Sequence, residues 1–323
     1  MNLGVLTVLY ADRPLEAVLD RAVELGLDAV ELGTGNYPGD DHCPPGELLA
    51  DPDRARALRR AVADRGLRIS ALSCHGNPLH PRAEIAQAHH ETWRSTLRLA
   101  ELLEVDVVNT FSGCPGDGPG ARFPNWVTCA WPPDYQELLA WQWDERVIPY
   151  WTAEAEQAGS HGVRAIALEM HPGFVVYNPE TLLRLRSAAG RRIGANFDPS
   201  HLFWQGIDPV EAIRELARDR AIFHAHAKDT AIDAANVRRN GVLDTKRHDA
   251  VLDRSWIFRT VGYGHGESTW RDIVSALRAV GYDDVLSIEH EDVLASRDEG
   301  LERAVALLRG VMLREPADDM WWS

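Results

Sequence analysis

The chain has 323 residues, of which 45% are hydrophobic and 26% are charged, a composition typical of a globular protein with a sizeable core. Its formal net charge of −15 argues against nucleic acids and anionic membranes as partners, because both bind basic surfaces. The four cysteines form neither a Cys-x-x-Cys motif nor a dense disulfide framework, and no apolar run approaches the ~20 residues of a membrane span. The first residues lack the basic region and cleavage site of a signal peptide, so we expect a cytoplasmic protein with reduced thiols.

Short apolar strands alternate with amphipathic helices along the chain. The strands are predicted at residues 3–9, 28–32, 68–75, 105–111, 164–170, 193–197, 221–229 and 285–289. The helices are predicted at residues 14–25, 52–65, 82–103, 134–161, 179–189, 209–219, 269–280 and 296–313. Gly26 is expected to end the first helix, and Asp208 to cap the start of the sixth.

Alternating strands and helices with no break in composition predict one parallel (β/α)8 TIM barrel as a single domain. A doubly wound open sheet is the alternative, because alternation alone does not show that the sheet closes. We expect the barrel to span residues 1–314 and residues 315–323 to form a C-terminal tail. Two long loops are expected at the active face: a Gly-, Pro- and Trp-rich loop at 112–133 and an irregular, charged segment at 230–267.

The seventh predicted strand carries an unusual set of polar residues, Ala-Ile-Phe-His-Ala-His-Ala-Lys-Asp at 221–229. A strand alternates between two faces. One face would carry Ile222, His224, His226 and Lys228, and the other Phe223, Ala225 and Ala227. Imidazoles and an ammonium group pointing into a core are costly unless they meet carboxylates, a metal or a ligand.

Three further strands end in carboxylates on the face predicted to point inward, Glu169, Asp198 and Glu289. The bulky apolar residues that alternate with them are expected to pack outward on the helices. Three carboxylates and the imidazole of His226 would repel one another at the barrel axis without a cation, which predicts a divalent metal. Mostly oxygen ligands favour Mn²⁺, and Mg²⁺, Co²⁺ or Zn²⁺ fit the same set. In the alternative interpretation the acids lie at the rim in water or in salt bridges, and for Lys228 a rim salt bridge is an equal alternative.

Five sequence motifs at strand ends resemble those of the xylose isomerase-like barrels. They are Ser-Cys-His-Gly-Asn-Pro at 73–78, Leu-Glu-Met-His at 168–171, Asn-Phe-Asp-Pro-Ser-His at 196–201, His-Ala-His-Ala-Lys-Asp at 224–229 and Ser-Ile-Glu-His-Glu-Asp at 287–292. The resemblance covers almost the whole chain. That superfamily includes sugar and sugar-phosphate isomerases and epimerases, inosose dehydratases and the endonuclease IV group, so the resemblance specifies the site better than the reaction.

The resemblance implies a role for each matching residue. The metal ligands would be Glu169, Asp198, His226 and Glu289. Contacts to the substrate are expected from His75, His201, His224, Lys228 and Glu291 in these motifs. Trp131 of the loop 112–133 is expected to join them, because aromatic faces commonly stack on sugar rings. The ketoepimerases that this sequence resembles place two glutamates on opposite faces of the sugar, and Glu169 and Glu289 match them. One would remove the proton next to a carbonyl and the other would return it, while the metal stabilises the enediolate.

The leading functional hypothesis is a metal-dependent isomerase or epimerase of an unphosphorylated sugar or keto-sugar. The glycine-rich stretch at 262–266 does not follow a predicted strand with Rossmann spacing, so it is weak evidence for a phosphate site. The closest alternative is a lyase that cleaves a keto-glycoside by β-elimination, since the long loops would admit a bulky aglycone. An endonuclease IV-like nuclease conflicts with the acidic charge, and a non-catalytic sugar-binding barrel would not need both glutamates. The expected partner is a small sugar or glycoside, with no nucleic acid and no membrane; a homo-oligomer or a companion subunit is left open.

Overall fold

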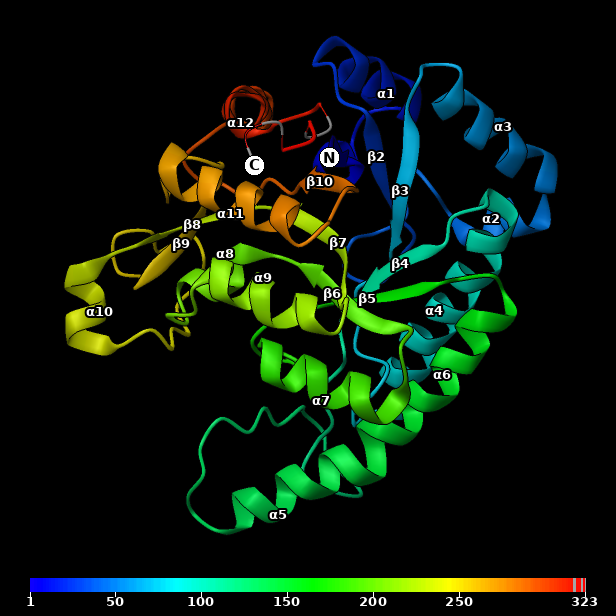
Figure 1. Ribbon diagram of the computed structural model, residues 1–323. Helices are drawn as coiled ribbons and strands as arrows, with labels where there is room; N and C mark the ends of the chain where they lie inside the picture. Colours follow the sequence, from blue (N-terminus) through cyan, green and yellow to red (C-terminus); the bar gives the residue numbers. More distant parts are fainter. Residues whose placement is uncertain (316–317, 321, 323) are drawn as a thin grey trace.

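Eight parallel strands close into a barrel in the computed structural model, which describes residues 1–315, 318–320 and 322 (Figure 1). The barrel strands are β1 (Asn2–Leu6), β2 (Ala29–Gly33), β3 (Arg68–Ser73), β4 (Val107–Thr110), β5 (Ala165–Glu169), β6 (Ile193–Phe197), β7 (Ile222–Ala227) and β10 (Val285–Ile288). The sheet closes because β1 pairs in parallel with both β2 and β10. The predicted TIM barrel is therefore confirmed, and the open-sheet alternative is wrong.

Helices surround the barrel (Figure 1). They are α1 (Leu15–Glu24), α2 (Pro45–Ala50), α3 (Pro52–Ala63), α4 (Ala83–Leu103), α5 (Asp134–Trp141), α6 (Ile148–Ser160), α7 (Pro179–Ala189), α8 (Pro199–Phe203), α9 (Pro209–Arg218), α10 (Ala234–Asn240), α11 (Glu267–Ala279) and α12 (Arg297–Val311). Asp208 caps α9 as predicted, accepting hydrogen bonds from the backbone N–H groups of Val210 and Glu211. None of the helices in the described part of the chain is long and apolar enough to cross a membrane.

Several predicted elements differ from the structure. The first predicted strand, 3–9, ends early and continues as a 3₁₀ turn at Thr7–Tyr10. The helix predicted at 134–161 is divided into α5 and α6 by a π-helical turn at Gln142–Val147. Pro149 follows that turn and has no N–H for the regular helical hydrogen bond, which accounts for the change of pattern. Residues 316, 317, 321 and 323 of the predicted tail lie outside the described residues, so the domain boundary at 314 stays a prediction.

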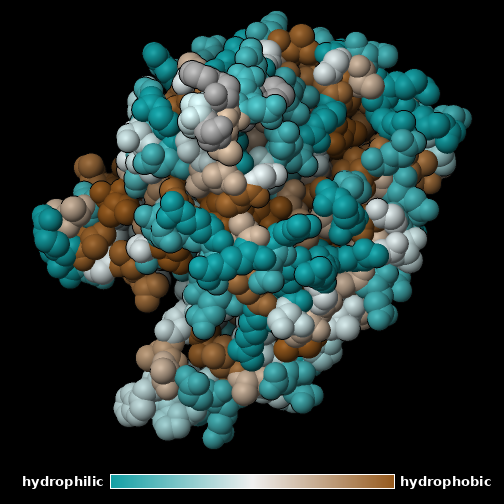
Figure 2. All heavy atoms as spheres, in the orientation of Figure 1, coloured by the Kyte–Doolittle hydropathy of each residue, from teal (hydrophilic) through white to brown (hydrophobic). Residues whose placement is uncertain are grey.

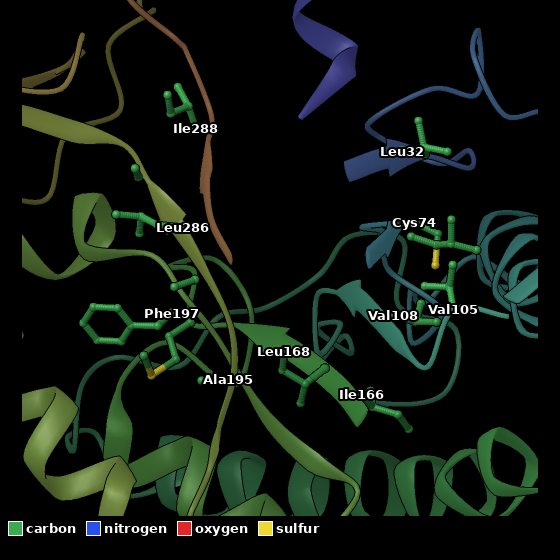
Figure 3. Close-up of a cluster of buried hydrophobic side chains, with 14 of the residues drawn as sticks. Leu32, Cys74, Val105, Val108, Ile166, Leu168, Ala195, Phe197, Leu286 and Ile288 are labelled. Carbon is green, nitrogen blue, oxygen red and sulfur yellow. The ribbon is translucent and has the colours of Figure 1, made fainter. Parts of the chain in front are cut away.

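The apolar strand residues form two separate layers. The outer layer lies between strands and helices, and Figure 3 shows Ile166, Leu168, Phe197 and Leu286 within it. The inner layer is a small cluster inside the barrel, formed by Ala71, Val107, Ala165 and Ala167 with Phe223 packed against it. Small inner and bulky outer residues were predicted for β5, and the structure confirms that arrangement. Because the inner apolar residues are small, the barrel interior toward the ends of the strands has room for polar side chains.

Phe223 lies inside the barrel because of a β-bulge. Ala195 pairs with Ile222 and Asn196 pairs with His224, so Phe223 is an extra residue between them. Ile222 packs against the outer apolar layer. The predicted faces of these two residues are therefore wrong, whereas His224 and His226 beyond the bulge point inward as predicted. A Cβ at Gly194 would lie 2.3 Å from the ring of Phe223, so only glycine fits opposite the bulge.

The segment predicted to be irregular, 230–267, contains regular structure. β8 (Asp229–Ile232) and β9 (Trp256–Arg259) form an antiparallel two-stranded sheet, with α10 between them. Alternating aromatic and apolar residues in β9 have a high strand propensity that the overall charge of the segment conceals. We call residues 229–267 the arm. The arm projects from the same side of the barrel as α5 and the loop before it (Figure 1).

Two buried carboxylates hold the arm: Asp229 at its start and Asp292 in the loop after β10. Asp229 accepts hydrogen bonds from the backbone N–H groups of Gly262, Gly264 and His265 and from the indole of Trp270. Asp292 accepts hydrogen bonds from Arg259 and from the backbone and hydroxyl of Thr260 at 2.7 to 3.2 Å. The bonds to Asp229 therefore join the two ends of the arm, and the bonds of Trp270 and Asp292 connect the arm to the rest of the barrel.

Candidate metal centre and active site

Four potential ligands converge at one end of the barrel. They are Glu169 at the end of β5, Asp198 after β6, His226 in β7 and Glu289 after β10. One ligand atom from each lies within 4.8 Å of the ligand atoms of the others. Parallel strands end at the same rim of a barrel, and inward-facing residues at that rim meet at the axis. The predicted convergence is therefore present, and the assignment of these residues as ligands remains a prediction.

Local backbone structure orients Asp198. It is the N-cap residue of α8, and its Oδ1 accepts a hydrogen bond from the backbone N–H of Ser200 at 2.8 Å. This bond directs Oδ2 toward the cluster. Asp198 is 1% exposed, and its burial raises its pKa to about 6, although the nearby His201 and Lys228 act in the opposite direction.

Two carboxylate oxygens in the cluster lack a hydrogen-bond donor among the described residues, Oδ2 of Asp198 and Oε2 of Glu289. Nitrogen atoms are close, with His201 Nε2 at 3.4 Å from the first oxygen and Lys228 Nζ at 3.2 Å from the second. Neither nitrogen is oriented to donate a hydrogen bond to the oxygen that it approaches. Buried carboxylate oxygens without donors are destabilising, and a divalent cation would satisfy both. The residues present therefore fit a metal with oxygen-rich ligation.

His226 joins the cluster to a second carboxylate below it. Its Nδ1 lies 3.1 Å from Glu289 Oε2 and 3.4 Å from Glu169 Oε2. Its Nε2 donates to the two oxygens of Glu31 at 3.1 and 3.0 Å. Burial would lower the pKa of His226, but the surrounding carboxylates, Glu31 first, raise it well above its usual value. A carboxylate behind a histidine is the arrangement that orients metal-ligating imidazoles in proteins.

Glu31 was missed by the sequence analysis. It lies on β2, is fully buried, and also accepts hydrogen bonds from Ser73, Asn109 and Ser287. Burial would raise its pKa, yet the neighbouring His226 and His224 keep it well below the usual value. The sequence did hold a signal, because Glu31 is a carboxylate near the end of the predicted strand 28–32.

Histidines surround Glu169. His201 Nε2 lies 3.0 Å from one of its oxygens, and His75 Nε2 lies 3.2 Å from the other. Burial would raise the pKa of Glu169, but the neighbouring imidazoles of His201, His226 and His75 lower it well below its ordinary range. His171 adds a further imidazole, with its ring centroid 4.1 Å from that of His201. Two predicted substrate residues, His75 and His201, therefore lie directly beside a predicted ligand.

Lys228 and Glu291 lie at the outer side of the cluster. The ammonium group of Lys228 is 3.2 Å from Glu289 and 2.6 Å from Glu291, and it lies 4.3 Å from the ring centroid of Phe258. Lys228 is 3% exposed, whereas the Glu291 side chain is 51% exposed. The predicted rim salt bridge is thus present, and it also brings the ammonium group to a carboxylate of the cluster.

The remaining two predicted substrate residues, His224 and Trp131, do not lie beside the predicted metal ligands at the end of the barrel. His224 is below the cluster, where it donates to Asn196 at 3.0 Å and is 1% exposed. Burial lowers its pKa to about 4, so it is neutral near pH 7. Trp131 is 74% exposed on the loop 112–133. Their roles toward a substrate stay predictions.

Comparisons with known proteins agree with the barrel. The chain is 38% identical to the uncharacterized protein YfiH of Bacillus subtilis (strain 168), covering 96% of this chain and 98% of that protein. The probable 3-DHS dehydratase AsbF from Bacillus anthracis has a similar structure, with a TM-score of 0.66, 17% identity, and 96% and 99% of the two chains covered. The D-psicose 3-epimerase from Clostridium cellulolyticum H10 gives a TM-score of 0.61 at 13% identity, with 97% and 99% covered.

Those two structural similarities show the fold alone, since the identities are low. The family is shown by a family-model match that extends over residues 19–311. The match includes every barrel strand except β1, and β1 supplies no residue to the cluster. On this match, and on the barrel that the structure confirms, the chain belongs to the xylose isomerase-like TIM barrels.

Proposed function

We propose that the protein is a divalent-metal-dependent sugar isomerase or epimerase that removes a proton from the carbon next to a carbonyl. The observation that carries this proposal is the buried cluster in which Glu169 and Glu289 meet Asp198 and His226. The cation proposed is Mn²⁺, held by these four residues. When bound, it would supply a Lewis acid beside the carbonyl and hydroxyl oxygens of the substrate.

Two glutamates from different strands supply the proposed acid and base. Glu289 would gain a raised pKa from burial, but Lys228 and then His226 lower it to about 2, so it is ionised near neutral pH. Glu169 is ionised for the corresponding reason, because imidazole nitrogens of three histidines lie 3.0 to 3.4 Å from its oxygens and lower its pKa. Each carboxylate can accept a proton from a substrate carbon on its own side of the site, and the other can return one. His201 and Lys228 hold these carboxylates in place through the contacts described above.

The charges around the cluster support an unphosphorylated substrate. Lys228 is already paired with Glu289 and Glu291. The glycine-rich stretch 262–266 offers no free anion site at Gly262 and Gly264, because the backbone N–H groups of both donate to Asp229. A phosphate would therefore meet carboxylates without a free cation to offset the repulsion.

A lyase that eliminates a group from a keto-glycoside is the second candidate. It would share the first step, removal of the proton next to the carbonyl, and differ in the fate of the electrons, which would expel a leaving group on the adjacent carbon. A pocket of about 460 Å³ beside the cluster favours this candidate, since a leaving group would need such a space. The name of AsbF, a probable dehydratase, is compatible with an elimination. The name of the D-psicose 3-epimerase is compatible with an epimerisation.

Solvent-deuterium exchange tests the proposal most directly. The Mn²⁺-loaded protein would be incubated in D2O with a panel of keto-sugars and keto-glycosides, and the products would be followed by NMR and mass spectrometry. For the leading candidate we expect deuterium next to the carbonyl in an isomer or epimer. For the lyase we expect a cleaved, unsaturated product that has lost the proton at that carbon, with deuterium only in substrate that exchanged and was recovered. Elemental analysis showing no bound metal after reconstitution with Mn²⁺, together with no exchange, would overturn the proposal.

A further inference from the structure

A pocket of about 460 Å³ lies beside the metal cluster, between the arm and the loop 112–133. Its walls come from segments far apart in the sequence, residues 126–128, 171–173, 201–204 and 243–258. His201 belongs both to this lining and to the cluster, because its Nε2 is 3.0 Å from Glu169 Oε1. The pocket therefore adjoins the reaction centre, and its volume is within the ~300–1,000 Å³ typical of small-molecule sites.

Aromatic side chains form much of this pocket. Trp204 and Trp256 stack on each other with ring centroids 4.6 Å apart and an angle of 7° between the planes. Phe258 packs edge-on against His201 at 5.5 Å and stacks with His248 at 5.8 Å. Trp126, which packs against Tyr177, lines the pocket from the opposite loop. Fixed aromatic walls of this kind suit a flat ring with apolar faces.

The charged groups of the pocket are already engaged with one another or with the backbone. Lys246 lies 2.9 Å from Asp244, which also accepts a hydrogen bond from the backbone N–H of Ser255. Arg254 donates to the carbonyl oxygens of Trp256 and Lys246 and lies over the Trp256 ring. A phosphate or carboxylate on the ligand would have to break these contacts, so the pocket favours an uncharged ligand.

Exposed apolar residues extend the pocket outward along the arm. Leu243 lines the pocket and is 64% exposed, and Figure 2 shows hydrophobic residues gathered on the arm where it projects from the barrel. We propose that this pocket binds a second, uncharged ring of the substrate, either an aryl group or a second sugar ring, while the reacting sugar lies at the metal cluster. The proposal rests on the proposed function and narrows its substrate class to glycosides that carry a ring substituent.

Isothermal titration calorimetry of the Mn²⁺-loaded protein tests the pocket without requiring turnover. The probes are methyl and phenyl β-D-glucoside, methyl and phenyl β-D-galactoside, and cellobiose. We expect a ring-bearing probe to bind at least about tenfold more tightly than its methyl counterpart, the gain available from one well-packed aromatic contact. A preference for the phenyl probes assigns an aryl group, and a preference for cellobiose assigns a second sugar. Equal affinities, or no binding of any probe, would overturn the proposal.

Matched variants locate the preference. Trp126→Ala and Leu243→Ser should each reduce the preference for the ring-bearing probe about fivefold, and Leu243 is exposed enough that its variant should fold. Phe123→Ala is the control, because Phe123 is 69% exposed in the same loop as Trp126 and does not line the pocket. An unchanged preference in both pocket variants would overturn the proposal. A ring preference in a protein that shows no exchange would sustain the pocket and count against the proposed reaction, so the two failures are distinguishable.

Discussion

Two carboxylate–histidine clusters share His226 and differ in how completely their oxygen atoms are hydrogen-bonded. The lower cluster consists of Glu31, His224 and His226, and the upper cluster of Glu169, Asp198, His226 and Glu289. Both oxygens of Glu31 accept hydrogen bonds from fixed neighbours in the barrel. In the upper cluster, Oδ2 of Asp198 and Oε2 of Glu289 accept none from the described residues.

This difference distinguishes a structural cluster from a binding site. Burial alone does not distinguish them, because Glu31, Asp198 and Glu169 are all at most 3% exposed. A buried carboxylate whose oxygens are all bonded needs no ligand and can fix its neighbours in place. A buried carboxylate with an unbonded oxygen destabilises the protein unless something binds there. The lower cluster therefore orients His226, and the upper cluster is expected to bind the cation.

The largest expected effect is on catalysis, from Glu169→Gln and Glu289→Gln. Glutamine keeps a carbonyl oxygen for a metal but cannot accept a proton as a carboxylate does. Each variant should retain the fold and lose at least ~10²-fold in turnover on the true substrate, the lower end for general acid–base catalysis. Steady-state kinetics with saturating Mn²⁺ would measure the loss.

Isotope exchange provides the control for these two variants. If the reaction is an epimerisation, each variant should still exchange the substrate hydrogen with solvent from one side only. Such exchange without product would support a two-base mechanism. Near-normal turnover in both variants would contradict it and leave His201 or Lys228 as candidates for the base.

Next in size is the effect of Glu31→Gln, which leaves the upper carboxylates intact. An amide nitrogen facing the donors of Ser73, Asn109 or Ser287 would break the bonds that now satisfy Glu31. Metal affinity should fall about 10–100-fold, the usual cost of removing a group that orients a ligand. The metal-free variant should also lose on the order of 3 kcal/mol of unfolding free energy, because a buried charge pair with His226 is broken. Chelator competition and urea denaturation would measure the two effects; unchanged metal affinity would show that the lower cluster does not support the upper one.

Asp198→Asn should have the opposite effect on stability. The pKa of Asp198 is raised to about 6 because burial disfavours its charged form, so at pH 7 the metal-free protein contains an unfavourable ionised carboxylate. The neutral amide should raise the unfolding free energy of the metal-free protein by about 3 kcal/mol, the equivalent of the rise in pKa from 3.8 to about 6. The same variant should bind Mn²⁺ more weakly, and added Mn²⁺ should partly restore activity. A loss of stability in the metal-free state would contradict the distinction between the two clusters.

Much of the candidate site could be predicted because the barrel converts sequence position into spatial position. Residues at the ends of parallel strands, facing inward by alternation, must meet at one rim, and this rule brought Glu169, Asp198 and Glu289 together. Glu31 obeys the same rule but lies in a strand with a single polar inward residue, so no cluster in its own sequence marked it. Its partners come from four other strands, and only the folded chain shows that they saturate it.

The errors in the fold have a different origin. The bulge at Phe223 depends on how β7 pairs with β6, and a single strand's alternation contains no information about its neighbour's register. The strand β9 was hidden by the charge of the arm around it, since its pairing partner β8 lies more than twenty residues earlier. Both features shape the site, because the bulge sets the faces of β7 and β9 supplies Trp256 and Phe258 to the pocket.

The smallest expected effect comes from a carboxylate outside both clusters, Asp298. It pairs with Arg13 at 2.7 Å and accepts a hydrogen bond from Tyr10 at 2.6 Å, but its side chain is 48% exposed. Hydrogen bonds, first from Arg13 and then from Tyr10, lower its pKa to about 2, so its stabilising effect is present above the unfolded pKa near ~4 and is lost as the pH falls toward 2. Asp298→Asn should therefore cost less than about 1 kcal/mol at pH 7, with or without Mn²⁺, because solvent screens an exposed pair. Urea denaturation of both proteins between pH 7 and pH 3 should show the difference shrinking below pH 4. A loss as large as that expected for Glu31→Gln would mean that exposed and buried carboxylates contribute alike, and hydrogen-bond completeness in the barrel would no longer distinguish the two clusters.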